Sequence, residues 1–176
     1  MKKALFSFAI VAAGLLVASC GNKSSNAEAP ADAAESEVAE AAEAPAANSA
    51  VESEYFTLSV PGGWKYNEDA SSSTSVTIDA PDYGQFESVV IYVNKEETSA
   101  EKLRDQYFGD GADKEKAADV TIGGKTFKHL YYTESADYGS DLFTEVDGGV
   151  LVVSLSRNLP VEAEALKPLV ESIKLK

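Results

Sequence analysis

The sequence predicts an α+β domain, a mainly antiparallel β-sheet flanked by helices, which follows an apolar amino-terminal segment and a low-complexity linker. Two segments repeat apolar residues at helical spacing. The glycine pairs at 123–124 and 148–149 each separate two strand-like runs, as hairpin turns do. The strand-like runs themselves cover residues 56–60, 75–79, 88–93, 119–122, 125–133, 142–146 and 150–156.

The first helix is expected to begin at Thr98, because Thr98 and Glu101 have the spacing of a capping box. The second is expected over residues 161–172, where apolar side chains recur every three or four positions. Pro168 lies inside it and lacks a backbone N–H donor, so we expect a kink or a restart there.

Residues 89–93 and 150–153 are apolar without alternation. Strands of this kind are usually covered on both faces. With one helix available for each side, the simplest arrangement is a three-layer α/β/α sandwich with the sheet in the middle.

The amino terminus has the pattern of a secretory signal: Lys2 and Lys3, an apolar run over residues 4–17, and small residues before Cys20. The run is shorter than the ~20 residues that a membrane-spanning helix needs. Residues 16–20, LVASC, resemble the lipobox of bacterial lipoproteins, which implies that Cys20 is acylated and becomes the mature amino terminus. The alternative is an ordinary signal peptide with a cysteine near its cleavage site. Residues 1–19 are therefore predicted to be a lipoprotein signal peptide.

Residues 20–53 are predicted to be the lipidated end and a disordered linker rich in alanine, glutamate, serine and proline. The simplest role for this segment is spacing; binding to a partner or a cell-wall polymer is the alternative. Residues 54–176 are long enough for one domain with a single core. The placement of Gly21 after Cys20 is similar to that in lipoproteins of the outer membrane of Gram-negative bacteria. The expected location is thus the cell envelope.

The chain has a formal net charge of −14, which argues against nucleic acid, whose phosphates require a basic face. The same charge disfavours lying flat on anionic lipid head groups and favours basic or cationic partners. Cys20 is the only cysteine, so an internal disulfide and a thiolate metal site are both excluded.

Residues 56–64, FTLSVPGGW, resemble the opening strand of PsbP-like domains, and residues 171–175, ESIKL, are similar to their closing stretch. The order of strands, helix and hairpin between these segments also agrees. The resemblance implies the fold shared by PsbP and the Ran-binding import factor Mog, an antiparallel sheet flanked by helices. It further implies a binding or assembly module and not a catalyst. No functional residue can be carried over by position.

Candidate catalytic and metal-binding residues are few. Residues 123–126, GGKT, end like a phosphate-binding loop, but Asp119 stands where that motif needs glycine, and a hairpin turn explains them. His129 is the only histidine, lies in a predicted strand, and is expected to be structural. Asp110, Asp113 and Glu115 cluster after the first helix and could suit calcium, but their spacing does not match an EF-hand. We therefore expect no cofactor and no catalytic residue, and assign no metal ligand.

Three aromatic residues are the candidate partner-binding residues. Asp82-Tyr83-Gly84 is echoed by Asp137-Tyr138-Gly139, each between two strands. Turns need aspartate and glycine for backbone reasons, and convergent turn chemistry explains most of the motif. A turn does not need a tyrosine, however, and tyrosine suits interfaces, so we expect these two loops to flank a partner-binding edge. Trp64 could stack on a sugar, or anchor the edge of the core.

Two classes of function stay open at this point. The first is a membrane-anchored, non-catalytic envelope lipoprotein whose domain binds or assembles a protein partner. The second is a solute- or carbohydrate-binding lipoprotein with a small ligand pocket. An enzyme is a distant third, because it would need a polar pocket around His129 or converging carboxylates.

Overall fold

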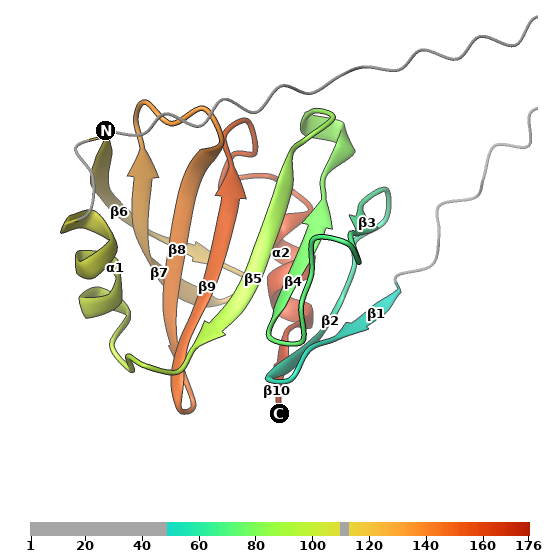
Figure 1. Cartoon of the computed structure of the whole chain (residues 1–176), viewed down its shortest axis with the longest axis horizontal. Coiled ribbons are helices and arrows are strands. Elements are labelled where there is room, and N and C mark those ends of the chain that lie inside the picture. The colour runs from blue at the N-terminus through green and yellow to red at the C-terminus, as the bar shows by residue number, and fades with distance from the viewer. Residues whose placement is uncertain (1–48, 110–112) are drawn as a thin grey trace, which may run out of the picture. The chain divides into compact units, whose positions relative to one another are not determined.

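The computed structural model describes residues 49–109 and 113–176. These form an α+β domain, mainly antiparallel sheet with two α-helices, in agreement with the predicted class. The main sheet has the strand order β3-β4-β5-β9-β8-β7-β6. Figure 1 shows these strands side by side. Their bounds are β3 Lys65–Tyr66, β4 Ser75–Asp79, β5 Ser88–Asn94, β6 Lys114–Ile122, β7 Lys125–Tyr132, β8 Tyr138–Val146 and β9 Gly149–Ser156.

The structure also has a second, three-stranded sheet, of which only the central strand, β2 (Phe56–Ser59), was predicted. It pairs with β1 (Ala50–Glu52) on one side and β10 (Lys174–Leu175) on the other. The folded region therefore begins at least four residues before the expected boundary at residue 54. Val51 explains the difference, because it pairs with Leu58 and is buried. One apolar residue in a polar stretch is too short a signal to predict a strand.

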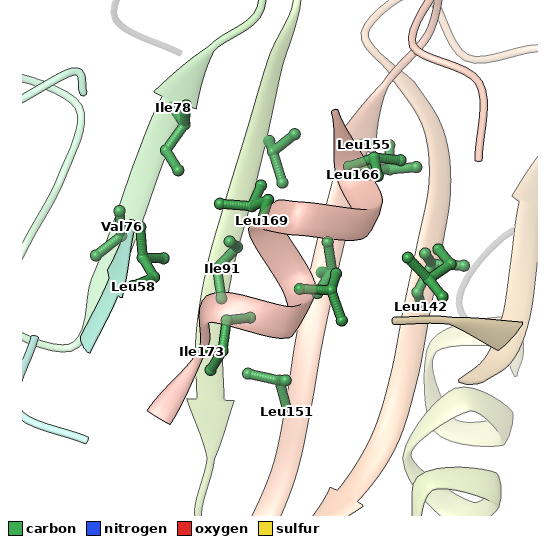
Figure 2. Packing of buried hydrophobic residues seen from close by; sticks show 14 of the residues in the cluster. Leu58, Val76, Ile78, Ile91, Leu142, Leu151, Leu155, Leu166, Leu169 and Ile173 are labelled. Carbon is green, nitrogen blue, oxygen red and sulfur yellow. The ribbon is translucent and has the colours of Figure 1, made fainter. Parts of the chain in front are cut away.

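Two hydrophobic clusters lie on opposite faces of the main sheet, because side chains alternate along a strand. On β9, Leu151, Val153 and Leu155 belong to the larger cluster, whereas Val150 and Val152 belong to the smaller one. Helix α2 (Leu166–Ser172) contributes Leu166, Leu169 and Val170 to the larger cluster, and Figure 2 shows it packed against the sheet. Helix α1 (Ala100–Gly109) contributes Ala100 and Leu103 to the smaller cluster.

Helix α1 begins two residues later than predicted. The backbone N–H of Leu103 donates to the carbonyl oxygen of Ser99, and the N–H of Lys102 donates to the Ser99 side chain at 3.4 Å. Ser99 is therefore the capping residue in place of Thr98. The two residues are adjacent and have similar capping preferences, so the sequence alone did not separate them.

Helix α2 is shorter than predicted, because residues 161–165 form turns and the helix begins at Leu166. Pro168 is the third residue of this helix, which continues without interruption to Ser172. The first N–H groups of a helix have no partner within the helix, so proline removes no hydrogen bond there. The helical spacing of residues 161–165 reflects burial without helix: Ala163 is buried, and Val161 and Ala165 pack against the larger cluster.

Gly123 and Gly124 both have positive φ, 58° and 75°, in the tight turn between β6 and β7. Residues 123–126 thus belong to a hairpin, as predicted, and do not open a helix as a phosphate-binding loop would. The predicted signal peptide, Cys20 and most of the linker lie outside the described residues. Within residues 49–109 and 113–176, no helix is long and apolar enough to cross a membrane.

Candidate functional site

Trp64 and Tyr83 lie together on the face of the sheet that α2 covers. Tyr83 ends a 3-10 helix, η1 (Pro81–Tyr83), and packs against the larger cluster. Trp64 is buried in that cluster, and its ring meets the Tyr83 ring edge-on at a centroid distance of 6.4 Å. Trp64 is therefore part of the core, with little surface left for stacking on a sugar.

Tyr138 lies on the opposite face and is 55% exposed. A β-bulge places it there: Tyr138 pairs with Ser156, but Ser140 pairs with Leu155, so Gly139 is an extra residue. In a regular strand without the bulge, alternation would turn Tyr138, two residues before Ser140, to the same face as Ser140. The structure thus does not bring Tyr83 and Tyr138 together.

The two Asp-Tyr-Gly motifs serve different backbone needs. Gly84 has a φ of 149°, a backbone angle that residues other than glycine rarely adopt. Gly139 is required for space, because a Cβ atom there would lie 2.7 Å from the carbonyl oxygen of Ser156. The repeated motif is therefore not a repeated site.

The surface around Tyr138 is the half of the sheet face that α1 leaves open. Helix α1 packs over β7 and β8, and Figure 1 shows it at the β6–β7 end of the sheet. Beyond it, Thr77, Val90, Ser154 and Asp141 form one row across β4, β5, β9 and β8. Two adjoining hollows of about 600 Å³ each lie over this row and share Val90, Tyr138 and Ser154. We call the two hollows together the tyrosine groove.

Asp141 is the polar centre of the first hollow and is 3% exposed. The Tyr132 hydroxyl donates to its Oδ2 at 2.5 Å, and the Ser154 hydroxyl donates to its Oδ1 at 2.5 Å. Both bonds lie at the short end of the range for hydrogen bonds between oxygen atoms. Burial, together with the hydrogen bond to Asp141, raises the pKa of Tyr132, so the phenol keeps its proton at neutral pH.

Two more tyrosines and a lysine complete the first hollow. The hydroxyls of Tyr92 and Tyr107 lie 2.8 Å apart, and burial raises the pKa of Tyr92. Lys114 Nζ donates to the carbonyl oxygen of Tyr107 and lies 5.1 Å from the centre of the Tyr132 ring. The Tyr138 ring also lies beside the Tyr132 ring, with 5.6 Å between their centroids.

The second hollow is walled by Phe86, which is 85% exposed, and floored by Thr77, Ser88 and Ser156. Glu87 lies at its rim. Burial acts to raise the pKa of Glu87, but hydrogen bonds from Ser156 and Asn158 outweigh burial and lower it. The groove therefore combines two exposed aromatic rings with a floor rich in hydroxyl groups.

His129 lies away from the groove, on the α2 side of β7. It is buried, its Nε2 is 2.8 Å from the Ser140 hydroxyl, and burial lowers its pKa. Of the candidate calcium ligands, Asp110 lies outside the described residues, and the carbonyl oxygen of Asp113 accepts hydrogen bonds from Thr133. Among the residues that the structure describes, no group of three acidic, histidine or cysteine side chains converges on a metal position.

Of the residues that line the groove, the sequence analysis singled out Tyr138 but not Asp141, Ser154, Tyr132 or Phe86. One signal was available in β9, where the continuous apolar run ends at Val153 and polar residues then alternate as Ser154 and Ser156. The alternation begins where α1 no longer covers this face of β9. Asp141 carried no such signal, because the chain is rich in carboxylates and nothing in their spacing distinguishes the buried one.

Comparison with known proteins adds little to this geometry. No protein-family model matches the chain, and no curated protein matches it. Among solved structures, the chain is similar to a crystal structure from Bacteroides thetaiotaomicron VPI-5482, with 16% identity and a TM-score of 0.44. The match covers 69% of this chain and 45% of that chain, so it spans less than half of the neighbour. A likeness this distant carries no functional argument.

Proposed function

We propose that the chain is a lipid-anchored lipoprotein of the bacterial cell envelope whose domain is a non-catalytic binding module. The tyrosine groove is the binding surface, and it is the observation that carries the proposal. Exposed aromatic rings beside a preformed hollow of several hundred cubic ångströms are typical of binding sites. Within this proposal the fold is the PsbP-like α/β/α sandwich, and Cys20 carries the lipid.

The chemistry around the groove supports binding over catalysis. The carboxylate of Asp141 already accepts hydrogen bonds from two hydroxyl groups and is nearly inaccessible, so it is poorly placed to act as a base. His129 packs on the α2 side of the sheet, away from the groove. Nucleophilic catalysis needs a base beside the nucleophile, and Ser154 has only the buried Asp141.

The size of the groove favours the second of the two binding classes, a solute- or carbohydrate-binding lipoprotein. Each hollow matches the 300–1,000 Å³ of typical small-ligand sites. Assembly with a protein partner stays the alternative, and it is supported by the exposure of Phe86 and Tyr138, because aromatic residues are enriched at interfaces.

Retention of envelope components by the immobilised full chain tests the binding proposal. Replacing Tyr138 with serine should reduce the amount retained by about tenfold, since it removes the exposed ring that both hollows share. Tyr131→Ser is the matched control, because Tyr131 is also an exposed tyrosine but lies on the α2 side. Equal retention by the wild type and the Tyr138 variant, with both folded, would exclude the groove as the binding surface.

Anchorage is tested separately through Cys20. A Cys20→Ala precursor should lose the lipid and leave the membrane fraction, as detected by metabolic labelling with a fatty acid and by fractionation. A variant that is still acylated and still sediments with membranes would overturn this part of the proposal. The two tests are independent, so binding can stand if anchorage fails.

A further inference from the structure

We propose that the tyrosine groove binds an uncharged carbohydrate of at least two sugar rings, with Tyr138 as the stacking platform between its two hollows. This inference deepens the proposed function and rests on it. Three observations support it: the hydrogen-bond donors and acceptors of the groove that remain available to a ligand, the local charge, and the length of the groove.

The floor of the first hollow offers acceptors. The hydroxyl hydrogens of Tyr132 and Ser154 are both committed to Asp141. A hydroxyl has one hydrogen and two lone pairs, so each of these oxygens can only accept from a ligand. Because the pKa of Tyr132 is raised, this arrangement persists at neutral pH. A ligand that uses this floor must bring O–H or N–H donors.

The same hollow also offers donors. In the Tyr92–Tyr107 pair only one hydroxyl hydrogen lies between the two oxygens, so the other hydrogen remains available. Lys114 Nζ has three hydrogens, and the carbonyl oxygen of Tyr107 takes one. A ligand therefore meets acceptors and donors side by side. Sugar hydroxyls match this pattern, because each one donates and accepts at once.

Local charge argues against the other ligand classes. An anion would meet the carboxylate of Asp141 and, at the edge of the same hollow, Asp113. A cation would meet Lys114, which lies against the Tyr132 ring of the first hollow. Because Asp137 and Glu87 line the second hollow, the glucosamine trimer described below tests the cationic class directly. A purely apolar ligand would leave the groove hydroxyls without partners, which costs free energy. An uncharged polyhydroxyl compound avoids all three penalties.

The two exposed rings set the length of the ligand. Tyr138 lines both hollows, and Phe86 lines the second. Apolar sugar faces pack on such rings, while the serine and threonine hydroxyls of the floor meet the sugar edges. A single sugar ring can lie in one hollow only. A linear oligosaccharide reaches across Tyr138 into both, so a trisaccharide should bind at least about tenfold more tightly than its monosaccharide.

The experiment begins with the envelope component that the full chain retains through Tyr138. One portion of the extract is oxidised with periodate, which cleaves the vicinal diols of sugars, and another is digested with proteinase. Loss of retention after periodate but not after proteinase is the expected result. Loss after proteinase alone would overturn the carbohydrate inference and leave the proposed binding function standing.

Defined probes then test the ligand class. The purified full chain, in a detergent without a sugar head group, is titrated with glucose, mannose and xylose trisaccharides, with trigalacturonate and with a glucosamine trimer. Binding is followed by calorimetry and by NMR of labelled tyrosine rings. At least one uncharged trisaccharide should bind and shift the Tyr138 ring signals. Tighter binding of the uronate or of the amine, or no response to any uncharged sugar, would overturn the inference.

Variants separate stacking from folding. Tyr138→Phe keeps the ring and should retain affinity to within about threefold, whereas Tyr138→Ser should lose about tenfold or more. Tyr131→Ser, on the other side of the sheet, should bind like the wild type. If Tyr138→Phe loses as much affinity as Tyr138→Ser, with an unchanged melting temperature, the ring is not a stacking platform and the inference fails.

Discussion

The two faces of the main sheet use the same strands for different purposes. Facing α2, the side chains of β5 and β9 are wholly apolar and buried: Val89, Ile91, Leu151, Val153 and Leu155. On the opposite face, the same two strands present Val90, Tyr92, Ser154 and Ser156, which are only half-buried. One face therefore stabilises the domain, and the open half of the other is free to bind.

The difference teaches how a small domain can keep a preformed polar groove. Strands with alternating side chains can satisfy both demands independently, because a change on one face leaves the other in place. The larger cluster stabilises the domain, and the groove needs only to keep its hydroxyl groups in fixed positions. The following predictions test that division.

The largest effect is expected for the neighbouring residues Ile91 and Val90, which point to opposite faces of β5. Ile91→Ala should lower the free energy of unfolding by about 2–5 kcal/mol, since it opens a cavity in the larger cluster. Val90→Ala should cost less than about 1 kcal/mol, because Val90 lies in the groove and is half-buried. Urea denaturation of both variants measures the contrast. Equal losses would mean that the two faces contribute equally to stability.

A smaller effect is expected at the polar centre of the groove. In a double-mutant cycle of Asp141→Ala and Tyr132→Phe, the coupling energy should be about 1.5–3 kcal/mol, as for a buried hydrogen bond to a charged group. Each single variant leaves one partner without its bond. Equilibrium denaturation of the wild type, the two single variants and the double variant gives the coupling. A value near zero would show that the hydroxyl is not committed to Asp141 in solution.

The bulge that turns Tyr138 toward the groove is tested with a glycine pair. Gly139→Ala should destabilise the domain by about 1–3 kcal/mol, because the added Cβ meets the backbone around Ser156. Gly62→Ala is the control, since nothing lies within 4 Å of its added Cβ, and its effect should be small. Thermal unfolding measures both variants. If Gly139→Ala unfolds like the control, the bulge does not depend on the close approach.

The smallest effect concerns pH and the α2 side. Burial lowers the pKa of His129, so the unfolded chain takes up a proton before the folded one as the pH falls through about 6.5. Stability should therefore decline between pH 7 and pH 5. His129→Gln should flatten this part of the profile, because His129 is the only histidine and unperturbed carboxyl groups titrate at lower pH. A decline that is identical in the variant would assign the pH dependence to other groups.

Long helices and strands were predictable from the sequence, and very short strands were not. All seven predicted strands and both helices are present. β1, β3 and β10 were missed, because strands of two or three residues are too short to show a period. Strands β6 and β8 begin earlier than predicted, where bulges at Ala117–Val120 and Tyr138–Ser140 interrupt the alternation on which the prediction relied.

The candidate site was predictable only in part. Tyr138 was singled out because a turn does not need an aromatic residue, but the same reasoning selected Tyr83, which packs beside Trp64 in the core region. Local sequence cannot tell these two tyrosines apart. Their difference lies in which face each reaches, and the β-bulge at Gly139 decides that for Tyr138.

The sequence by itself determined the class of fold, the hairpin at Gly123–Gly124 and the helical and strand periodicities, because each depends on residues close together in the chain. It also carries the lipobox-like segment that ends at Cys20, from which anchorage is proposed. The tertiary structure alone decided that Asp141, Ser154, Tyr132 and Tyr138 meet, since they come from three strands and a bulge. It also decided that α1 covers only half of its face. The groove is a consequence of that partial cover, which depends on packing and leaves no local trace in the chain except the polar end of β9.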